Sequence, residues 1–317
     1  MAYQTGTAAT LDDLLDLLRA FVAANGWTVN YWSGVGGGAS AILQIAKGTQ
    51  YVNLAAYSRS ATNFRGVAGS YTDHYLRISG SRGYDAGLAW NLQPGAYTTY
   101  TTNTSWLTGP LAAYHFFADA DYVHVVVEQI AGAFRHFHFG RAELIGGVLA
   151  ADYVTGMEPN HAASYCWQET ISQHHFPFNS DVSFAGSYFS RLYSDVDTAG
   201  WRHFHYAWTA LQRAYGINRT LGPWSGLMAN PQPNDFNGGQ ILLPIHLFVE
   251  RASSLYTHIG TVRDLRYINI QQLQPGQEIT LGADTWKVFP WHEKHPWNTN
   301  DGLPSSGYYG WAYRKVV

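Results

Sequence analysis

The sequence has little cysteine, little charge and no long hydrophobic run. Cys166 is the single cysteine among 317 residues, which excludes an intrachain disulfide and a zinc cluster held by several thiolates. No apolar run approaches the roughly 18 residues that a membrane-spanning helix needs, so we expect no membrane span. The N-terminal stretch MAYQTGTAATLDDLLDLL lacks the basic and apolar regions of a secretory signal peptide. We therefore expect a protein that is made in a cytoplasm and is not secreted by the usual route.

Charged residues make up only 13% of the chain, and the net charge is −3. A typical soluble domain carries about 25% charged residues, so this chain should present an unusually neutral surface. The sequence contains no cluster of lysine and arginine, whereas nucleic-acid binding calls for basic patches. We therefore expect no nucleic-acid partner.

Aromatic residues and glycine are abundant instead. Aromatic residues reach 15%, with 12 Trp and 22 Tyr, and there are 32 Gly. Trp and Tyr are enriched at interfaces because they bury a large area with few rotatable bonds and keep a polar group. Glycine in such number indicates many turns. Together these features indicate a β-rich, loop-rich protein with extensive contacts.

The hydrophobic periodicity predicts one helix followed mainly by strands. Residues 10–25 carry apolar residues at helical spacing, with Thr10 as the N-cap and Gly26 at the left-handed C-terminal position. Strands are expected at 27–33, 41–47, 50–57 and 75–79, within 111–153, and again from residue 239. The glycine run in SGVGGGASA lacks the Lys-Ser/Thr of a phosphate-binding loop, so we interpret it as a hairpin or interface loop.

The expected fold class is mainly β (α+β), with antiparallel sheets arranged as a β-sandwich or a barrel-like structure, an N-terminal helix and long loops. Three segments are expected along the chain. Residues 1–155 form the N-terminal helix plus a β-domain, and residues 156–235 form an irregular, aromatic-rich insertion. Residues 236–317 form a small β unit that is able to pack back on the first segment. A long irregular segment is usually functional, at an interface or binding surface.

Three histidines come together in DYVHVVVEQIAGAFRHFHFGRAE, which predicts two strands and a turn. With a turn of about three residues at 130–132, His124 lies opposite His138, and His136 lies two residues away on the same face. Such a patch has two interpretations. It is a zinc or iron site, because two His at i and i+2 with a cross-strand His can chelate a metal, or it is a half-polar face covered by another subunit or layer. HxH is a weak motif and H-E-x-x-H is absent, so we favour the covered face and expect no metal or other cofactor.

No motif of an enzyme is present. The chain lacks the G-x-S-x-G elbow of serine hydrolases. Cys166 has His161 nearby in the sequence, but a buried thiol is the preferred interpretation. Glu158 and Glu169 resemble a glycosidase pair only in being carboxylates. We therefore expect no catalytic residues and no enzyme activity.

The C-terminal third contains LLPIHLFVER, then YTHIGTVRDLRYINIQQLQPGQEITLGADTWKVFPW, and then GYYGWAYRKV. This succession resembles the ending of virion structural proteins of tailed bacteriophages, with an LPI strand, an L-x-P-G-x-x-(I/V) turn and a W-K-V-F-P strand. YVHVVVEQIAGAFRHFHFG is similar to the central part of such proteins, and TLDDLLDLLRAFVAANGWTV to their N-terminal helix and strand. The resemblance leaves residues 156–236 uncovered, and its motifs are structural.

The resemblance implies a structural component of a phage virion, in the tail, baseplate or neck, that is assembled in the cytoplasm of the host bacterium. Among these places we expect the tail tip or baseplate. Its expected partners are other virion proteins and further copies of itself in a closed homo-oligomer. Aromatic, low-charge surfaces would form the interfaces, with Trp224, Trp291, Trp297 and Trp311 as the candidate interface residues. One alternative is a receptor- or carbohydrate-binding module of the tail, which would stack a host surface glycan on WHEKHPWNTNDG or GPWSGLMANP. A lesser alternative is a metal-dependent hydrolase that uses the histidine patch.

Overall fold

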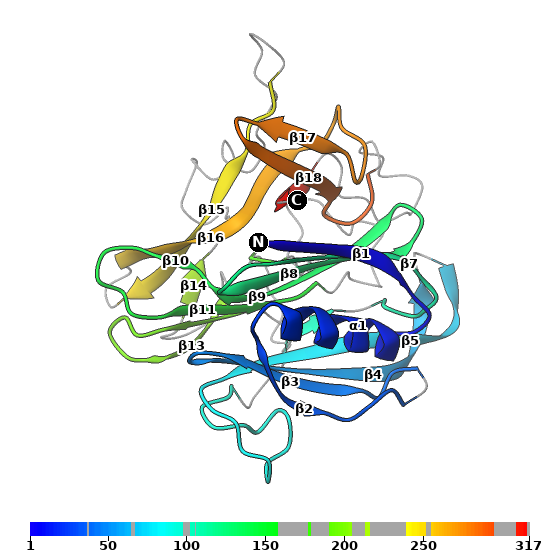
Figure 1. Ribbon diagram of the computed structural model, residues 1–317, viewed down its shortest axis with the longest axis horizontal. Coiled ribbons are helices and arrows are strands. Elements are labelled where there is room, and N and C mark those ends of the chain that lie inside the picture. The colour runs from blue at the N-terminus through cyan, green and yellow to red at the C-terminus, as the bar shows by residue number, and fades with distance from the viewer. Residues whose placement is uncertain are drawn as a thin grey trace.

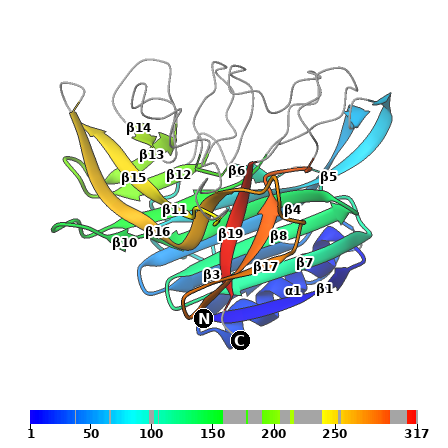
Figure 2. The same cartoon turned by 90° about the horizontal axis from the view of Figure 1, so that it is seen from above.

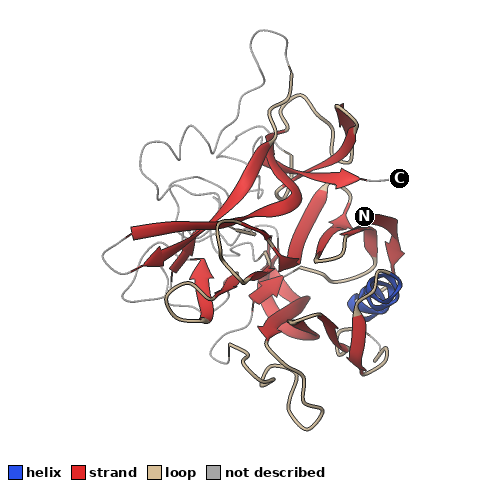
Figure 3. Ribbon diagram, turned by 60° about the vertical axis from the view of Figure 1, so that its left-hand side comes forward, coloured by secondary structure: helices blue, strands red, loops and turns tan. Residues whose placement is uncertain are grey.

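The computed structural model describes residues 1–36, 38–64, 67–97, 102–104, 106–157, 177–178, 190–204, 213–215, 239–251, 255–294 and 309–315. In these residues the chain is mainly β, with one helix and two sheets (Figure 3). The described strands pair in an antiparallel manner except for β13 and β14, which run parallel. Both sheets are open, so the predicted class is confirmed and the sandwich is the better description of the two expected architectures.

The smaller sheet contains five strands in the order β2-β3-β4-β5-β6. Its strands and the helix α1 have the following bounds: α1 Leu11–Ala24, β2 Thr28–Trp32, β3 Ile42–Lys47, β4 Gln50–Phe64, β5 Val67–Ser81 and β6 Thr102–Thr104.

The larger sheet contains 14 strands in the order β1-β7-β8-β9-β11-β12-β13-β14-β15-β16-β19-β18-β17, with β10 paired to β16. The bounds of its strands are β1 Ala2–Ala8, β7 Leu111–Ala118, β8 Tyr122–Ile130, β9 Ala133–Arg141, β10 Glu143–Leu144, β11 Ala151–Thr155, β12 Arg191–Ser194, β13 Gly200–Phe204, β14 Arg213–Tyr215, β15 Leu243–Arg251, β16 Leu255–Asn269, β17 Glu278–Leu281, β18 Asp284–Pro290 and β19 Tyr309–Lys315.

The helix begins and ends where the sequence predicts. The Thr10 hydroxyl accepts a hydrogen bond from the Asp13 N–H at 3.1 Å, and Gly26 has φ +79° just after the helix. The helix α1 lies between the smaller sheet and strands β1 and β7 (Figure 1). Its apolar face is buried there, and Phe21 packs on Phe116. Within the described residues, no helix is long and apolar enough to cross a bilayer.

The glycine run of the sequence folds around a buried carboxylate. The Asp12 side chain, in the first turn of α1, is fully buried. It accepts backbone hydrogen bonds from Gly36 at 3.1 Å, Gly38 at 3.2 Å, Ser40 at 2.8 Å and Ala41 at 2.8 Å. Burial by itself raises the pKa of this carboxyl, but the four N–H groups together lower it below the usual value. The loop therefore anchors the start of the helix to the start of β3.

Strands β7, β8 and β9 form a middle layer that is buried on both faces. On β8, Val123 and Val125 face the core that α1 and the smaller sheet share, whereas Tyr122 and Val126 face a second core. This second core is completed by β15, β16, β18 and β19, because the larger sheet curls until its C-terminal strands lie over its own first strands (Figures 1 and 2). The result is three stacked layers.

One hydrogen-bonded sheet runs through all three segments that the sequence analysis separates. Strands β12, β13 and β14 belong to residues 156–235, and they connect β11 to β15. Strand β10, near the end of the first segment, pairs with β16 in the last. The expected boundary near residue 156 therefore falls within a continuous sheet. The remainder of residues 156–235 lies outside the described residues, apart from 177–178.

Two features of the strands differ from the sequence expectation. Residues Ala2–Ala8 form the outer strand β1, which AYQTGTA did not reveal because it has no apolar alternation. Strands β4 and β5 have 15 residues each and pair as far as Phe64 and Val67, well beyond the expected 50–57 and 75–79. The outer halves of these two strands form a two-stranded ribbon that projects from the body (Figure 2).

The C-terminal turns follow the expected turn chemistry. Gly276 has φ +77°, and the Gln277 N–H donates to the Gln274 carbonyl at 3.0 Å, as in a type II turn after Pro275. Gly282, with φ +63°, lies in the tight turn between β17 and β18. The residue types at both turns account for their backbone conformations.

Candidate functional site

As the sequence predicts, the three candidate histidines share one face of β8 and β9. It is the face that lines the second core. The strand register places His124 opposite His138, with His136 two residues along the same strand. The connecting turn has two residues instead of three, and a register shift near the end of β8 restores the expected pairing. The ring centres of His124 and His138 lie 5.0 Å apart, and those of His136 and His138 lie 6.4 Å apart. All three side chains are fully buried.

Strands from the C-terminal part of the same chain cover this histidine cluster. His124 Nε2 donates to the Arg263 carbonyl of β16 at 2.9 Å, and His136 Nε2 donates to the Pro290 carbonyl of β18 at 2.9 Å. His136 Nδ1 accepts from the Tyr313 hydroxyl of β19 at 2.7 Å. A carbonyl can only accept, so Nε2 carries the proton in both rings. Of the two expected interpretations, these contacts match a half-polar face covered by another layer.

The environment keeps the three imidazoles neutral at pH 7. Burial lowers the pKa of His124 to about 4 and that of His136 to about 3. Burial, with two imidazoles alongside, lowers the pKa of His138 well below its usual value. Neutral imidazole is the form that binds a metal, but the Nδ1 lone pair of His136 already accepts from Tyr313. In the part of the chain that the structure describes, no three His, Cys, Asp or Glu side chains are grouped so that they could hold a metal ion.

His138 is the one member of the cluster held by packing alone. Its ring stacks on Phe178 at 5.6 Å between centres and lies 5.8 Å from the ring of Tyr313. Neither of its nitrogens has a hydrogen-bond partner among the described residues, and the same holds for the hydroxyl of the neighbouring Tyr153. A buried polar group without a partner costs stability. This position is therefore the most informative one for a substitution.

A second group of polar contacts borders the cluster. The Tyr122 hydroxyl donates to the Asp264 carboxylate, and burial raises the pKa of Tyr122. Arg314 pairs with Asp264 at 3.2 Å and with Asp284 at 2.7 Å. These contacts connect β8 to β16, β18 and β19, so the polar groups around the cluster hold the middle layer and the C-terminal layer together.

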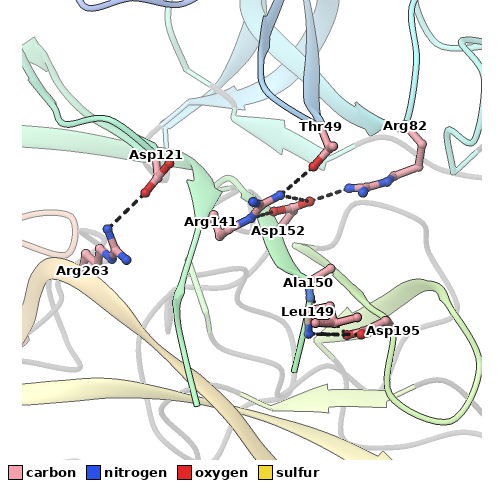
Figure 4. A network of polar contacts seen from close by, with 9 residues as sticks. All are labelled: Thr49, Arg82, Asp121, Arg141, Leu149, Ala150, Asp152, Asp195 and Arg263. Atoms are coloured by element: carbon pink, nitrogen blue, oxygen red, sulfur yellow. Dashed lines mark hydrogen bonds and ion pairs between the residues drawn. The ribbon is translucent and has the colours of Figure 1, made fainter. Parts of the chain in front are cut away.

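Asp152 on β11 provides the corresponding connection to the smaller sheet (Figure 4). Its carboxylate accepts from Arg82, just after β5, at 2.5 Å and from Arg141 of β9 at 2.8 Å. Arg141 also donates to the Thr49 hydroxyl, between β3 and β4, at 2.8 Å. The hydrogen bond to Asp152 raises the pKa of Arg141. The arginines here are paired with a carboxylate of their own chain.

One buried arginine was not among the residues expected from the sequence. Arg135 on β9 is fully buried, and its guanidinium lies 4.7 Å from the ring centre of Trp106. Its Nη1 donates to the Phe134 carbonyl at 2.6 Å and to His292 Nδ1. A lone arginine within the apolar stretch AFRHFHF was the available signal. Arg135 connects β9 to Trp106, which precedes β7, and to His292, which follows β18.

The four tryptophans expected at an interface divide into two pairs. Trp291 and Trp311 lie in the core between the layers, where they are 7% and 1% exposed and their ring centres are 5.3 Å apart. The expectation that these two face a neighbouring subunit is therefore wrong, because residues of their own chain cover them. Trp224 and Trp297 lie outside the described residues.

Other sequence candidates also lie outside the described residues. They are Cys166, His161, Glu158, Glu169, the segment GPWSGLMANP and most of WHEKHPWNTNDG. No protein-family model matches the sequence, and no curated protein matches it.

Proposed function

We propose that this chain is a structural component of a tailed-bacteriophage virion, in the tail tip or baseplate, and that it acts by binding neighbouring proteins. The observation that carries the proposal is the burial of the histidine cluster by strands of the same chain. His124 and His136, the side chains that most resemble a chemical site, are buried and hydrogen-bonded to the C-terminal strands. Groups of this kind stabilise a scaffold, whereas catalysis needs groups that a substrate can reach.

The surface offers two features that suit an assembly role. One is the ribbon of β4 and β5, which projects beyond the layers (Figure 2). The other is the loop between β10 and β11, where Leu149 is 78% exposed. The Asp195 carboxylate accepts from the N–H groups of Leu149 at 3.1 Å and Ala150 at 3.1 Å, which fixes the loop (Figure 4). An apolar side chain exposed on a fixed loop gains free energy when a partner protein covers it.

Quantitative mass spectrometry of purified particles of the phage that encodes the chain tests the proposal. The expected result is a constant copy number for each particle through repeated density-gradient purification. A non-structural protein of the same phage serves as the control, because it should be lost in the same steps. If the chain is present in the infected-cell lysate and absent from the purified particles, the proposal is wrong.

A further inference from the structure

The projecting ribbon leaves one strand edge unpaired in the described part of the chain. Strand β3 pairs with β4 only over Gln50 to Ala55, and the Ala56 N–H then donates to the Ala41 carbonyl at 2.8 Å. From residue 57 to residue 64, the strand pairing of β4 is with β5 alone. Alternate residues of a strand direct their backbone groups to the same side. The N–H and C=O groups at positions 58 and 60 therefore face the open side, like those of Ala56.

The opposite edge of the ribbon is covered over the same stretch. The Leu107 N–H donates to the His74 carbonyl at 2.8 Å. The Thr108 hydroxyl accepts from the His74 N–H at 2.9 Å and donates to the Thr72 carbonyl at 3.2 Å. Residues 106–108 thus occupy the β5 side, whereas no described residue pairs with the backbone groups on the β4 side.

Side chains fix the direction in which the ribbon projects. Tyr57 stacks on Tyr75 with ring centres 5.7 Å apart, and the Trp90 indole N–H donates to the Tyr57 hydroxyl at 3.0 Å. Arg59 pairs with the buried Asp73 at 3.0 Å. A two-stranded hairpin alone is marginally stable in water, and an open edge is a template for a further strand. The root of the ribbon is therefore rigid, and its outer part would gain stability from a third strand.

The open edge carries none of the charges that usually protect an outer strand. Lysine, proline and inward-pointing charges are the common means of preventing edge-to-edge pairing. Residues 57–64, YSRSATNF, contain neither lysine nor proline. Their one charge, on Arg59, is paired with Asp73 of the same ribbon, and the exposed side chains at positions 58 and 60 are serines.

We infer that the β4 edge at residues 57–64 binds the same edge of a second copy of this chain, in an antiparallel pair about a two-fold axis. In such a pair each residue of the edge meets a residue of the identical edge. Unpaired charges would then oppose like charges, whereas uncharged serines at Ser58 and Ser60 allow close approach. The smaller sheets of two copies become one continuous sheet. This inference rests on the proposed assembly role for its place in a particle, but the pairing is a property of the isolated chain.

Two variants that carry opposite charges at the same edge positions test the pairing in solution. One variant carries Ser58→Lys and Ser60→Lys, and the other carries Ser58→Glu and Ser60→Glu. Sedimentation velocity of the full chain is measured up to about 100 μM, a range suited to the affinity of a small interface. The wild type is expected to form a concentration-dependent dimer. Each variant alone should dissociate at least about ten-fold more readily, and an equimolar mixture of the two should recover the dimer.

A matched control places the same charges on the other outer strand of that side of the sheet. Thr28 and Tyr31 on β2 are both exposed, so Thr28→Lys with Tyr31→Lys should leave the dimer intact. Circular dichroism of every variant shows that the fold is retained. A monomeric wild type would overturn the inference and leave the edge to a different protein. Unchanged dimers in the lysine variant, or no recovery in the mixture, would also overturn it. The particle measurement is separate, so the two proposals can fail independently.

Discussion

Acid should destabilise this protein through its buried histidines, and His138→Phe should reduce that effect. The folded-state pKa values of His124 and His136 are about 4 and about 3, below the 6.5 of an unperturbed histidine. As the pH falls below 6.5, the unfolded chain therefore takes up protons that the folded chain does not. The neutral histidines therefore contribute their full stabilisation above about pH 6.5. This contribution is lost as the pH falls toward their folded-state pKa values.

The size of the effect follows from the proton linkage. For each histidine that stays neutral in the folded state, the free energy of unfolding falls by about 1.4 kcal/mol for each pH unit below the unfolded-state pKa. Between pH 7 and pH 5 this amounts to about 2 kcal/mol for each such histidine. The pKa of His138 is lowered in the same direction, by burial and by two neighbouring imidazoles. Replacing this ring with phenylalanine should therefore reduce the loss between pH 7 and pH 5, by at most about 2 kcal/mol.

Phenylalanine suits the position because the His138 ring packs against the rings of Phe178, Tyr313 and His124, and no hydrogen bond among the described residues is lost. Urea titrations at pH 7 and pH 5, followed by tryptophan fluorescence, give the unfolding free energies. Tyr153→Phe is the control, because it removes a buried hydroxyl next to the cluster that does not titrate in this range. If His138→Phe loses as much stability as the parent between pH 7 and pH 5, the linkage argument is refuted.

Two further substitutions test the contacts that join the layers. Asp12→Asn should lower the unfolding free energy by about 2–3 kcal/mol at pH 7, because four backbone N–H groups lose a charged acceptor. A loss below about 0.5 kcal/mol in a urea titration would show that the carboxylate charge is unimportant. Asp152→Asn should cost about 1 kcal/mol, because its partners Arg82 and Arg141 are partly exposed. This cost should shrink in about 1 M salt, and a salt-independent cost would contradict the ion-pair account.

Much of the local structure was predictable because it depends on neighbours within a few residues. The caps of α1 at Thr10 and Gly26 follow from residue type and helical spacing. The pairing of His124 with His138 followed from side-chain alternation and a short turn, although the turn itself has two residues. The outer halves of β4 and β5 escaped prediction, because a ribbon that leaves the core no longer needs an apolar face.

The packing of particular side chains was not predictable in the same way. In the sequence, Asp12 is an acidic residue in the first turn of a helix, where the helix dipole favours a negative charge. Only the folded loop shows that Gly36, Gly38, Ser40 and Ala41 donate to it. Trp291 and Trp311 were expected at an interface because the sequence does not distinguish an exposed tryptophan from a buried one. Such assignments depend on which distant segment covers a side chain.

The sequence by itself determined the β class, the helix α1, the tight turns and the alternation that brings three histidines to one face. The tertiary structure alone decided that this face lies inside the chain. The groups that cover it, the Arg263 carbonyl, the Pro290 carbonyl and the Tyr313 hydroxyl, are 139, 154 and 177 residues from the histidines they bind. No local pattern encodes a partner at that separation. The larger sheet must curl over itself before a half-polar strand becomes a buried one.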